Sequence, residues 1–367
     1  MRPELPTRRD EAWRWADLRH AEAFLETPAP ANDALPETDH LWLDLAGPRQ
    51  LFVAGQPVGA AAQAPTPDRT LPRHPLADLA AARATAGATL EIPAGADAGL
   101  VQLLHVGRGG AAHGITRVIL GAGARLTLVE SFADEGQDHW LNHRLDAELG
   151  PGAELVRVSR TLSGHGLVSD RAAVRMREAS RFVHLTLGLG AASLRAEVEV
   201  LLEGAGAHAE VDGILLADGA AVLDALTRLD HRVPDTSSRQ RWRLVAGGTA
   251  QASIAGGVAV ARHAQKTDAE QSLKALLLRR TAAVNLKPEL EIFADDVACA
   301  HGCTVGELDR AALFYLGTRG VPPAEAEALL TLAFVADALA GLPEGALQDA
   351  LDAEARAWLA RHAGGRA

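Results

Sequence analysis

Two thiols and one imidazole alternate in a short segment near the C-terminus. Cys299, His301 and Cys303 are separated by single small residues, and the chain has no other cysteine. In an extended segment residues i, i+2 and i+4 point to one side, so the three side chains are expected to share a face. Thiolate and imidazole are ligands that zinc and iron-sulfur clusters prefer. The segment therefore predicts a face that binds a metal or a cluster.

Three donors are one fewer than a closed zinc or cluster site requires, so a second chain would have to complete such a site. Thr304 and Glu307 have the spacing of a capping box, which predicts a helix N-terminus directly after Cys303 and would favour its thiolate. An alternative remains open, in which Cys299 is a small buried residue and His301 is a hydrogen-bonded loop residue.

The segment ends a long region, from Thr89 to about Cys299, in which apolar and polar residues alternate. This period of two predicts strands with one buried face. Gly-rich turns begin at Gly121, Gly150 and Gly204, at intervals of 29 and 54 residues, and the second interval is close to twice the first. A repeat of that length is typical of a β-solenoid, and an antiparallel sandwich with Gly-rich turns is an equally weighted alternative.

Helical patterns flank the alternating region. They divide the chain into an N-terminal helical region, a β core and a C-terminal helical region, at residues 1–88, 89–303 and 304–367. Thr7 is a candidate N-cap for a helix that extends to Phe24, and a short helix is expected over residues 77–84. Three further helices are expected in the C-terminal region: one behind the capping box, one from Pro322 and one over residues 347–359.

Charge and hydropathy limit the partners. The net charge of −11 argues against nucleic acid and anionic membranes, which both reward clustered Lys and Arg. The longest apolar stretch, residues 328–339, is too short to span a bilayer and contains Asp337. The first ten residues carry three arginines and no apolar run. We therefore expect a cytoplasmic protein with no nucleic-acid or membrane partner.

Other candidate sites are weaker. The run 107–112 loosely matches a dinucleotide-binding turn, but a strand is expected after it where that motif needs a helix. Asp295 and Asp296 are neighbours, and neighbours on a strand face opposite sides, so surface or turn positions are expected instead of an acid/base pair. No catalytic residue is predicted.

The remaining histidines give no clear site. His139 and His143 are a candidate metal pair, for which a solvated loop is the favoured interpretation. Three scattered histidines are expected to face solvent: His208, His231 and His263.

Residues 264–306 closely resemble the C-terminal signature of the SufB/SufD family. The matching residues are Ala264-Gln265-Lys266-Thr267-Asp268-Ala269, Gln271, Leu276-Leu277-Leu278, Lys287-Pro288-Glu289-Leu290-Glu291-Ile292-Phe293-Ala294-Asp295-Asp296-Val297, Cys299-Ala300-His301-Gly302 and Thr304-Val305-Gly306. The opening residues 5–15 are similar to the start of SufD members. Together with the modest length and the Asp-Asp-Val-x-Cys-x-His-Gly form, this favours the SufD branch.

The resemblance implies a fold: a right-handed parallel β-helix flanked by N- and C-terminal helical regions. It also implies a non-catalytic scaffold subunit of the SUF iron-sulfur cluster assembly complex. Such a subunit forms a heterodimer with a SufB-like subunit through the β-helix ends and docks the ATPase SufC on its C-terminal helical region. SufC would bind ATP, because this chain lacks a Gly-Lys-Ser/Thr phosphate loop. A homodimer of the isolated chain is an open possibility.

The same resemblance implies the site residues. His301 and Cys299 match a histidine and a cysteine at the SufB/SufD interface, where a transient iron-sulfur cluster is shared with the SufB-like partner and no cofactor is permanently bound. Cys303 stands where relatives usually have a small residue without a thiol, so no role carries over. Two rivals remain: a structural homodimeric β-helix with an inert Cys/His face, and a β-helical polysaccharide lyase or hydrolase, which needs clustered carboxylates.

Overall fold

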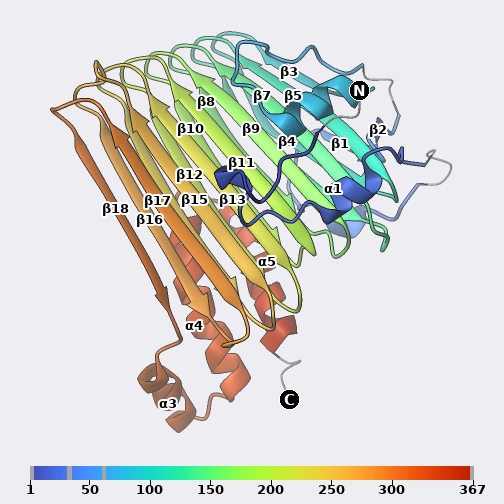
Figure 1. The fold of residues 1–367 in the computed structure, drawn as a ribbon, viewed down its shortest axis with the longest axis vertical. Coiled ribbons are helices and arrows are strands. Elements are labelled where there is room, and N and C mark those ends of the chain that lie inside the picture. Colours follow the sequence, from blue (N-terminus) through green and yellow to red (C-terminus); the bar gives the residue numbers. More distant parts are fainter. Residues whose placement is uncertain (1–3, 31–34, 60–62, 364–367) are drawn as a thin grey trace.

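The computed structural model describes residues 4–30, 35–59 and 63–363, and its core is a β-solenoid (Figure 1). Successive strands alternate between two sheets, and each strand of the solenoid pairs in parallel with the strand two places along the chain. Strands β3 to β18 therefore form about eight turns. The parallel β-helix is confirmed, and the antiparallel sandwich is wrong.

The strands fall into two sets. The ten-stranded sheet consists of β18 (Ala298–Gly306), β16 (Asp268–Leu277), β14 (Ser237–Ala246), β12 (His208–Ala217), β10 (Arg181–Leu189), β8 (Glu154–Thr161), β6 (Arg125–Asp134), β4 (Asp97–Gly107), β1 (Arg49–Val53) and β2 (Gln56–Pro57), in that order. The eight-stranded sheet consists of β17 (Ala283–Ile292), β15 (Gln251–Val260), β13 (Val222–His231), β11 (Ser193–Leu202), β9 (Leu167–Met176), β7 (Trp140–Leu149), β5 (Ala111–Leu120) and β3 (Gly87–Ile92).

The Gly-rich turns stack on one another along the solenoid. Gly123 donates its N–H to the carbonyl of Pro151 at 2.8 Å, and Gly152 donates to the carbonyl of Glu178 at 2.8 Å. The turn between those at Gly150 and Gly204 is residues 177–180, where Ala179 takes the left-handed conformation at φ 52° that glycine usually occupies. The 54-residue interval is therefore two turns of the solenoid, with the middle one hidden because it lacks glycine.

The N-terminal region is less helical than expected. Instead of one helix to Phe24 it contains a 3-10 turn, η1 (Glu11–Trp13), and a separate short helix, α1 (Arg19–Phe24). A second 3-10 turn, η2 (Asp39–Leu41), precedes the hairpin of β1 and β2, which was not anticipated. Helix α2 (Pro75–Arg83) lies where a short helix was predicted.

Three helices follow the solenoid, as predicted, but the first starts later. Thr304 pairs with Lys274 inside β18, so the predicted capping box at Thr304 is wrong. The first helix is α3 (Arg310–Thr318), and the carboxylate of Asp309 caps it by accepting the N–H of Ala311 at 2.8 Å. It is followed by α4 (Pro323–Leu339) and α5 (Ala346–Ala363). Within the described ranges, none of the helices has the length and apolarity needed to cross a membrane.

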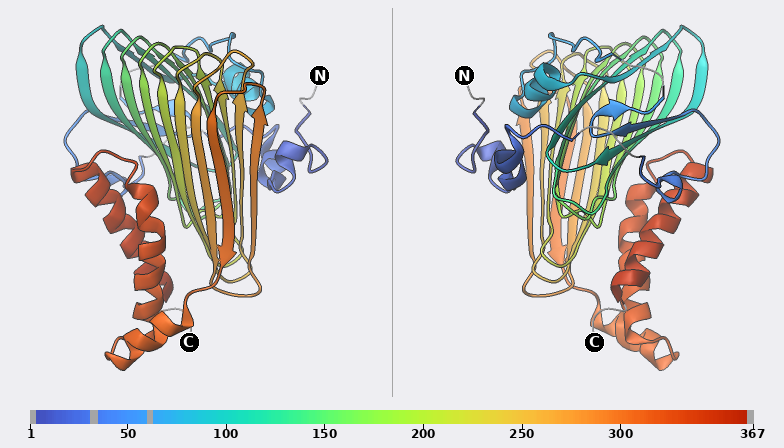
Figure 2. Two further views of the ribbon diagram at one scale, coloured as in Figure 1. Left: turned by 90° about the vertical axis from the view of Figure 1, so that its left-hand side faces the viewer. Right: turned by 90° about the vertical axis from the view of Figure 1, so that its right-hand side faces the viewer.

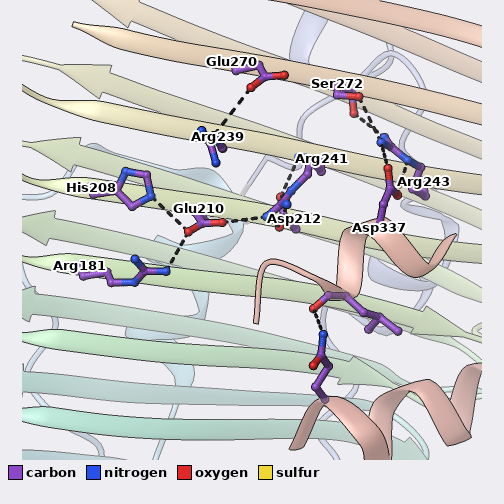
Figure 3. Close-up of polar contacts among 12 residues, drawn as sticks. Arg181, His208, Glu210, Asp212, Arg239, Arg241, Arg243, Glu270, Ser272 and Asp337 are labelled. Atoms are coloured by element: carbon purple, nitrogen blue, oxygen red, sulfur yellow. Dashed lines mark hydrogen bonds and ion pairs between the residues drawn. The ribbon is translucent and has the colours of Figure 1, made fainter. Parts of the chain in front are cut away.

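Helices α4 and α5 pack on the outer face of the ten-stranded sheet (Figure 2). Their buried apolar side chains meet those of the sheet in one cluster, which includes Val183, Leu185, Val335, Ala338, Leu351 and Trp358. Two ion pairs fix this contact: Asp337 binds the buried guanidinium of Arg243, and Glu354 binds Arg160 (Figure 3 shows the first). Because this outer face is covered, the strands beneath it are buried on both sides.

Candidate functional site

Strand β18 is the last strand of the ten-stranded sheet and lies at its free edge (Figure 1). It pairs only with β16, in a register that places Cys299 beside Ala269, His301 beside Gln271 and Cys303 beside Leu273. The three residues of β16 are buried, so their side chains line the interior of the solenoid. Residues paired in a parallel ladder point to the same side. Cys299, His301 and Cys303 therefore occupy the interior-facing positions of the last turn, where no further turn covers them.

This placement leaves the imidazole accessible. His301 and Cys303 are exposed, and Cys299 is half-buried. The two thiols are free, and His301 is not sealed inside its own chain. Cys303 lies in mid-strand, remote from the start of α3 at Arg310, so the expectation that a helix N-terminus favours its thiolate is wrong.

The three donors share a face without converging. A strand rises about 3.3 Å per residue, so alternate side chains stand roughly 6.6 Å apart. Within the part of the chain that the structure describes, one group of three potential ligands has its donor atoms within 4.8 Å of one another, and it lies elsewhere. Burial raises the pKa of the Cys299 thiol above its ordinary value, although a backbone hydrogen bond with Ala269 opposes this. Among the described residues of the last turn, the donors thus stand singly and do not form a closed site.

The surface around these donors is apolar. Of the large apolar side chains that are exposed among the described residues, three lie at the last turn: Ile292, Phe293 and Val305. Three more lie on the C-terminal helices: Phe314, Tyr315 and Leu329. A solenoid normally ends in a polar cap, and an uncovered strand edge is a template for pairing. We call the surface formed by β17, β18 and Phe293 the open end.

Two further carboxylate pairs among the described residues, Glu210 with Asp212 and Asp295 with Asp296, do not form an open acid/base site. Glu210 and Asp212 lie on the outer face of the ten-stranded sheet, and both bind Arg241 (Figure 3). Burial raises the pKa of Asp212 to about 7 despite Arg241. However, the backbone of Gly341 lies so close that a Cβ there would approach the Asp212 Oδ2 to 2.1 Å. A polysaccharide chain therefore has no room beside this carboxylate. Asp295 and Asp296 are exposed, as predicted.

Sequence reasoning missed a polar cluster inside the solenoid. Glu130, His143, Arg157 and Asp170 are all buried there, so His143 is not in a solvated loop. The guanidinium of Arg157 binds Glu130 at 2.7 Å and Asp170 at 2.9 Å. Burial acts to raise the pKa of Asp170, but Arg157 and His143 hold it below its ordinary range. His105 completes the cluster, and burial holds its pKa well below the ordinary value.

The other histidines are only partly as expected. His263 is exposed and His208 is half-buried, but His231 is buried and hydrogen-bonded to Thr236 and Ser238, so its predicted exposure is wrong. His139 is also buried, and its ring nitrogens face the carbonyl of Gln137 and the hydroxyl of Ser163. The buried histidines could have been recognised in the sequence as single polar residues at alternate positions that are otherwise apolar.

Comparison with known proteins finds relatives over most of the chain. The family described as "SUF system FeS cluster assembly, SufBD core domain" matches residues 104–334. The iron-sulfur cluster assembly protein SufD of Escherichia coli is 30% identical over 377 residues, which cover 95% of this chain and 88% of that protein. SufD of Bacillus subtilis is 39% identical over 92 residues, covering 25% of this chain and 21% of that protein. Protein ABCI7, chloroplastic, of Arabidopsis thaliana is 30% identical over 240 residues, covering 63% and 50%.

These matches define the class as a β-solenoid of iron-sulfur cluster assembly, and the chain belongs to the SufB/SufD family. Within that family it is of the SufD type. The relatives support a role in iron-sulfur cluster assembly.

Proposed function

We propose that this chain is a non-catalytic scaffold subunit of the SUF iron-sulfur cluster assembly complex, which forms a heterodimer with a SufB-like subunit through its open end. The observation that carries the proposal is the uncovered last turn, where interior-facing positions are exposed and Val305 and Phe293 are 51% and 65% accessible. Covering such apolar surface is favourable by about 25 cal/mol per Å². In the isolated chain the same surface would pair with a second copy.

His301 and Cys299 are the proposed ligands of a transient cluster shared with the SufB-like partner. The spacing of the donors supports sharing, because single donors about 6.6 Å apart cannot enclose a cluster without ligands from another chain. The raised pKa of the Cys299 thiol means that iron has to displace a proton from it. No permanently bound cofactor is proposed at this turn.

The C-terminal helices are the proposed docking surface for the ATPase SufC. Phe314 and Tyr315 on α3 are 75% and 57% exposed, and α3 extends beyond the sheet (Figure 2). Helices α4 and α5 are fixed to the solenoid through Asp337 and Glu354. A movement imposed on these helices by a partner would therefore be transmitted to the solenoid.

The test is co-expression of the chain with its SufB and SufC partners, with iron and sulfide measured per purified complex. His301→Ala is expected to leave the complex intact and to reduce cluster accumulation several-fold, because a ligand is lost at an exposed position. His40→Ala is the matched control, because His40 is also exposed but lies far from the last turn in the chain. Normal cluster accumulation by an intact His301→Ala complex would remove the site assignment. Failure of the wild-type chain to co-purify with either partner would remove the proposed function.

A further inference from the structure

A second set of metal-ligand side chains lies inside the solenoid near its N-terminal end. His105 on β4, Glu130 on β6 and His143 on β7 each place one potential ligand atom within 4.8 Å of the other two. All three side chains are buried. We call this set the luminal triad. It joins both sheets, because β4 and β6 belong to the ten-stranded sheet and β7 to the eight-stranded one.

The hydrogen bonds of His143 fix which nitrogen faces the triad. Nδ1 of His143 lies 3.0 Å from an Asp170 oxygen and donates its proton there. Metal-bound histidines commonly make this contact with a carboxylate, because it orients the ring and leaves Nε2 free to coordinate. Nε2 of His143 lies 3.4 Å from the Glu130 Oε1. A four-coordinate ion with bonds of about 2 Å holds its ligand atoms roughly 3.4 Å apart.

The neighbouring residues donate too few hydrogen bonds to satisfy all the acceptor atoms of the triad. The hydroxyl of Thr116 lies 2.7 Å from the Glu130 Oε1 and 3.1 Å from the His143 Nε2, and its single hydrogen serves only one of them. The Nε2 of His105 is buried and has no hydrogen-bond partner within the described part of the chain. Such a nitrogen has lost its hydration without replacement, which is costly; the Nδ1 of His184 is another, outside the triad.

The charges of the surrounding groups do not balance, and a bound cation would neutralise the excess negative charge. Glu130 and Asp170 carry two negative charges, and Arg157, which contacts both, carries one positive charge. With neutral imidazoles the buried cluster has one excess negative charge, which is costly in a dry interior.

We propose that the luminal triad binds a divalent transition-metal ion of the ferrous or zinc class. Two imidazole nitrogens and one carboxylate oxygen are the donors that such ions prefer, and an open fourth position takes water. Mg²⁺ and Ca²⁺ prefer all-oxygen sites and bind weakly here. The ion is distinct from the cluster proposed at the open end, and it links the two sheets across the interior.

The experiment uses the full chain with Cys299→Ser, His301→Ala and Cys303→Ser, so that ligands at the open end contribute nothing. This parent is produced in medium supplemented with Co²⁺, so that the ion is present while the chain folds, and is then dialysed. Elemental analysis is expected to find about one cobalt per chain, with the visible spectrum of a four-coordinate site. Production with Zn²⁺ is expected to give the same ratio, and with Mg²⁺ none.

His105→Phe in this parent is the test variant, because its ring stacks between Phe52 and Phe132 with centroids 5.0 and 5.1 Å away and a phenyl ring fits the same space. We expect it to fold and to lose the cobalt. His184→Phe is the matched control, a buried histidine outside the triad, and it is expected to keep the cobalt.

A parent that retains less than a tenth of an equivalent of Co²⁺ and of Zn²⁺ overturns the proposal whether or not the variants fold, and leaves a proton as the only cation besides Arg157 that could balance the two carboxylates. Retention of cobalt by a folded His105→Phe chain overturns it as well. Neither result bears on cluster assembly at His301, which the parent lacks.

Discussion

The two ends of the solenoid differ in how their last strands are covered. At the N-terminal end the β1–β2 hairpin extends the ten-stranded sheet, and Phe52 of β1 packs on His105 and is only 3% exposed. At the C-terminal end Val305 of β18 is 51% exposed. Both residues occupy interior-facing positions of a parallel ladder. The difference in their exposure therefore depends on whether other segments of the chain cover that end of the solenoid. One end is closed by the protein itself, and the other is uncovered.

The polar residues of the two ends should therefore have different roles. Arg157 and its two carboxylates are sealed near the closed end, where an ion must be neutralised by its neighbours to be tolerated. His301 and Cys303 at the open end are hydrated in the isolated chain. Substitutions near the closed end should change the free energy of unfolding, whereas substitutions at the open end should change association.

The largest effect is expected for Arg157→Met. Removing the guanidinium leaves the buried Glu130 and Asp170 without their cation, which should lower the free energy of unfolding by about 3–5 kcal/mol. Urea unfolding followed by circular dichroism measures the change. Arg228→Met is the control, because Arg228 is half-exposed and its pairs with Asp230 and Glu291 should each contribute less than about 1 kcal/mol. Equal losses for the two variants would contradict the assignment of Arg157 to a sealed interior.

Val305→Asp should have the next largest effect. It should lower the affinity for the SufB-like subunit and leave the free energy of unfolding unchanged. A carboxylate at position 305 of the open end would have to be desolvated on pairing, which should weaken binding of the SufB-like subunit by about 2 kcal/mol or roughly 30-fold. Titration of the purified chain against that subunit measures this change.

The unfolding midpoint of Val305→Asp should remain that of the wild type, since the side chain is exposed. Leu35→Asp places the same charge at another exposed apolar position and should not affect binding. Wild-type affinity in Val305→Asp would show that the open end is not the interface.

Much of the fold could be predicted because strand alternation and turn residues are local signals. The repeat was harder to see, since Ala179 replaces glycine in one turn and doubles the apparent interval. The N-terminal hairpin was missed because β2 is only Gln56–Pro57, which is too short to show alternation. The capping box failed because Thr304 was already paired in the ladder, and tertiary pairing outweighs a local capping preference.

The site was predicted only in part. The position of His301 at a strand edge follows from the sequence, but its exposure depends on the absence of a further turn. The polar cluster inside the solenoid was missed because the alternation of polar and apolar residues does not say which face of a strand is interior. In β10, Val183 and Leu185 contact the C-terminal helices, while His184 and Thr186 face the interior. Both faces are buried, so the polar residues were wrongly expected to face solvent.

The smallest effect concerns pH and tests whether His231, in the middle of the solenoid, is sealed from solvent. Burial lowers the pKa of His231 from 6.5 to about 4. Between these values the unfolded chain binds a proton that the folded chain does not, so stability falls as the pH decreases from 6.5 towards 4. His231→Gln should remove up to about 1.4 kcal/mol per pH unit from that slope, as measured by urea unfolding from pH 7 to 5. An unchanged slope in His231→Gln would mean that the His231 ring is not sealed inside the folded chain.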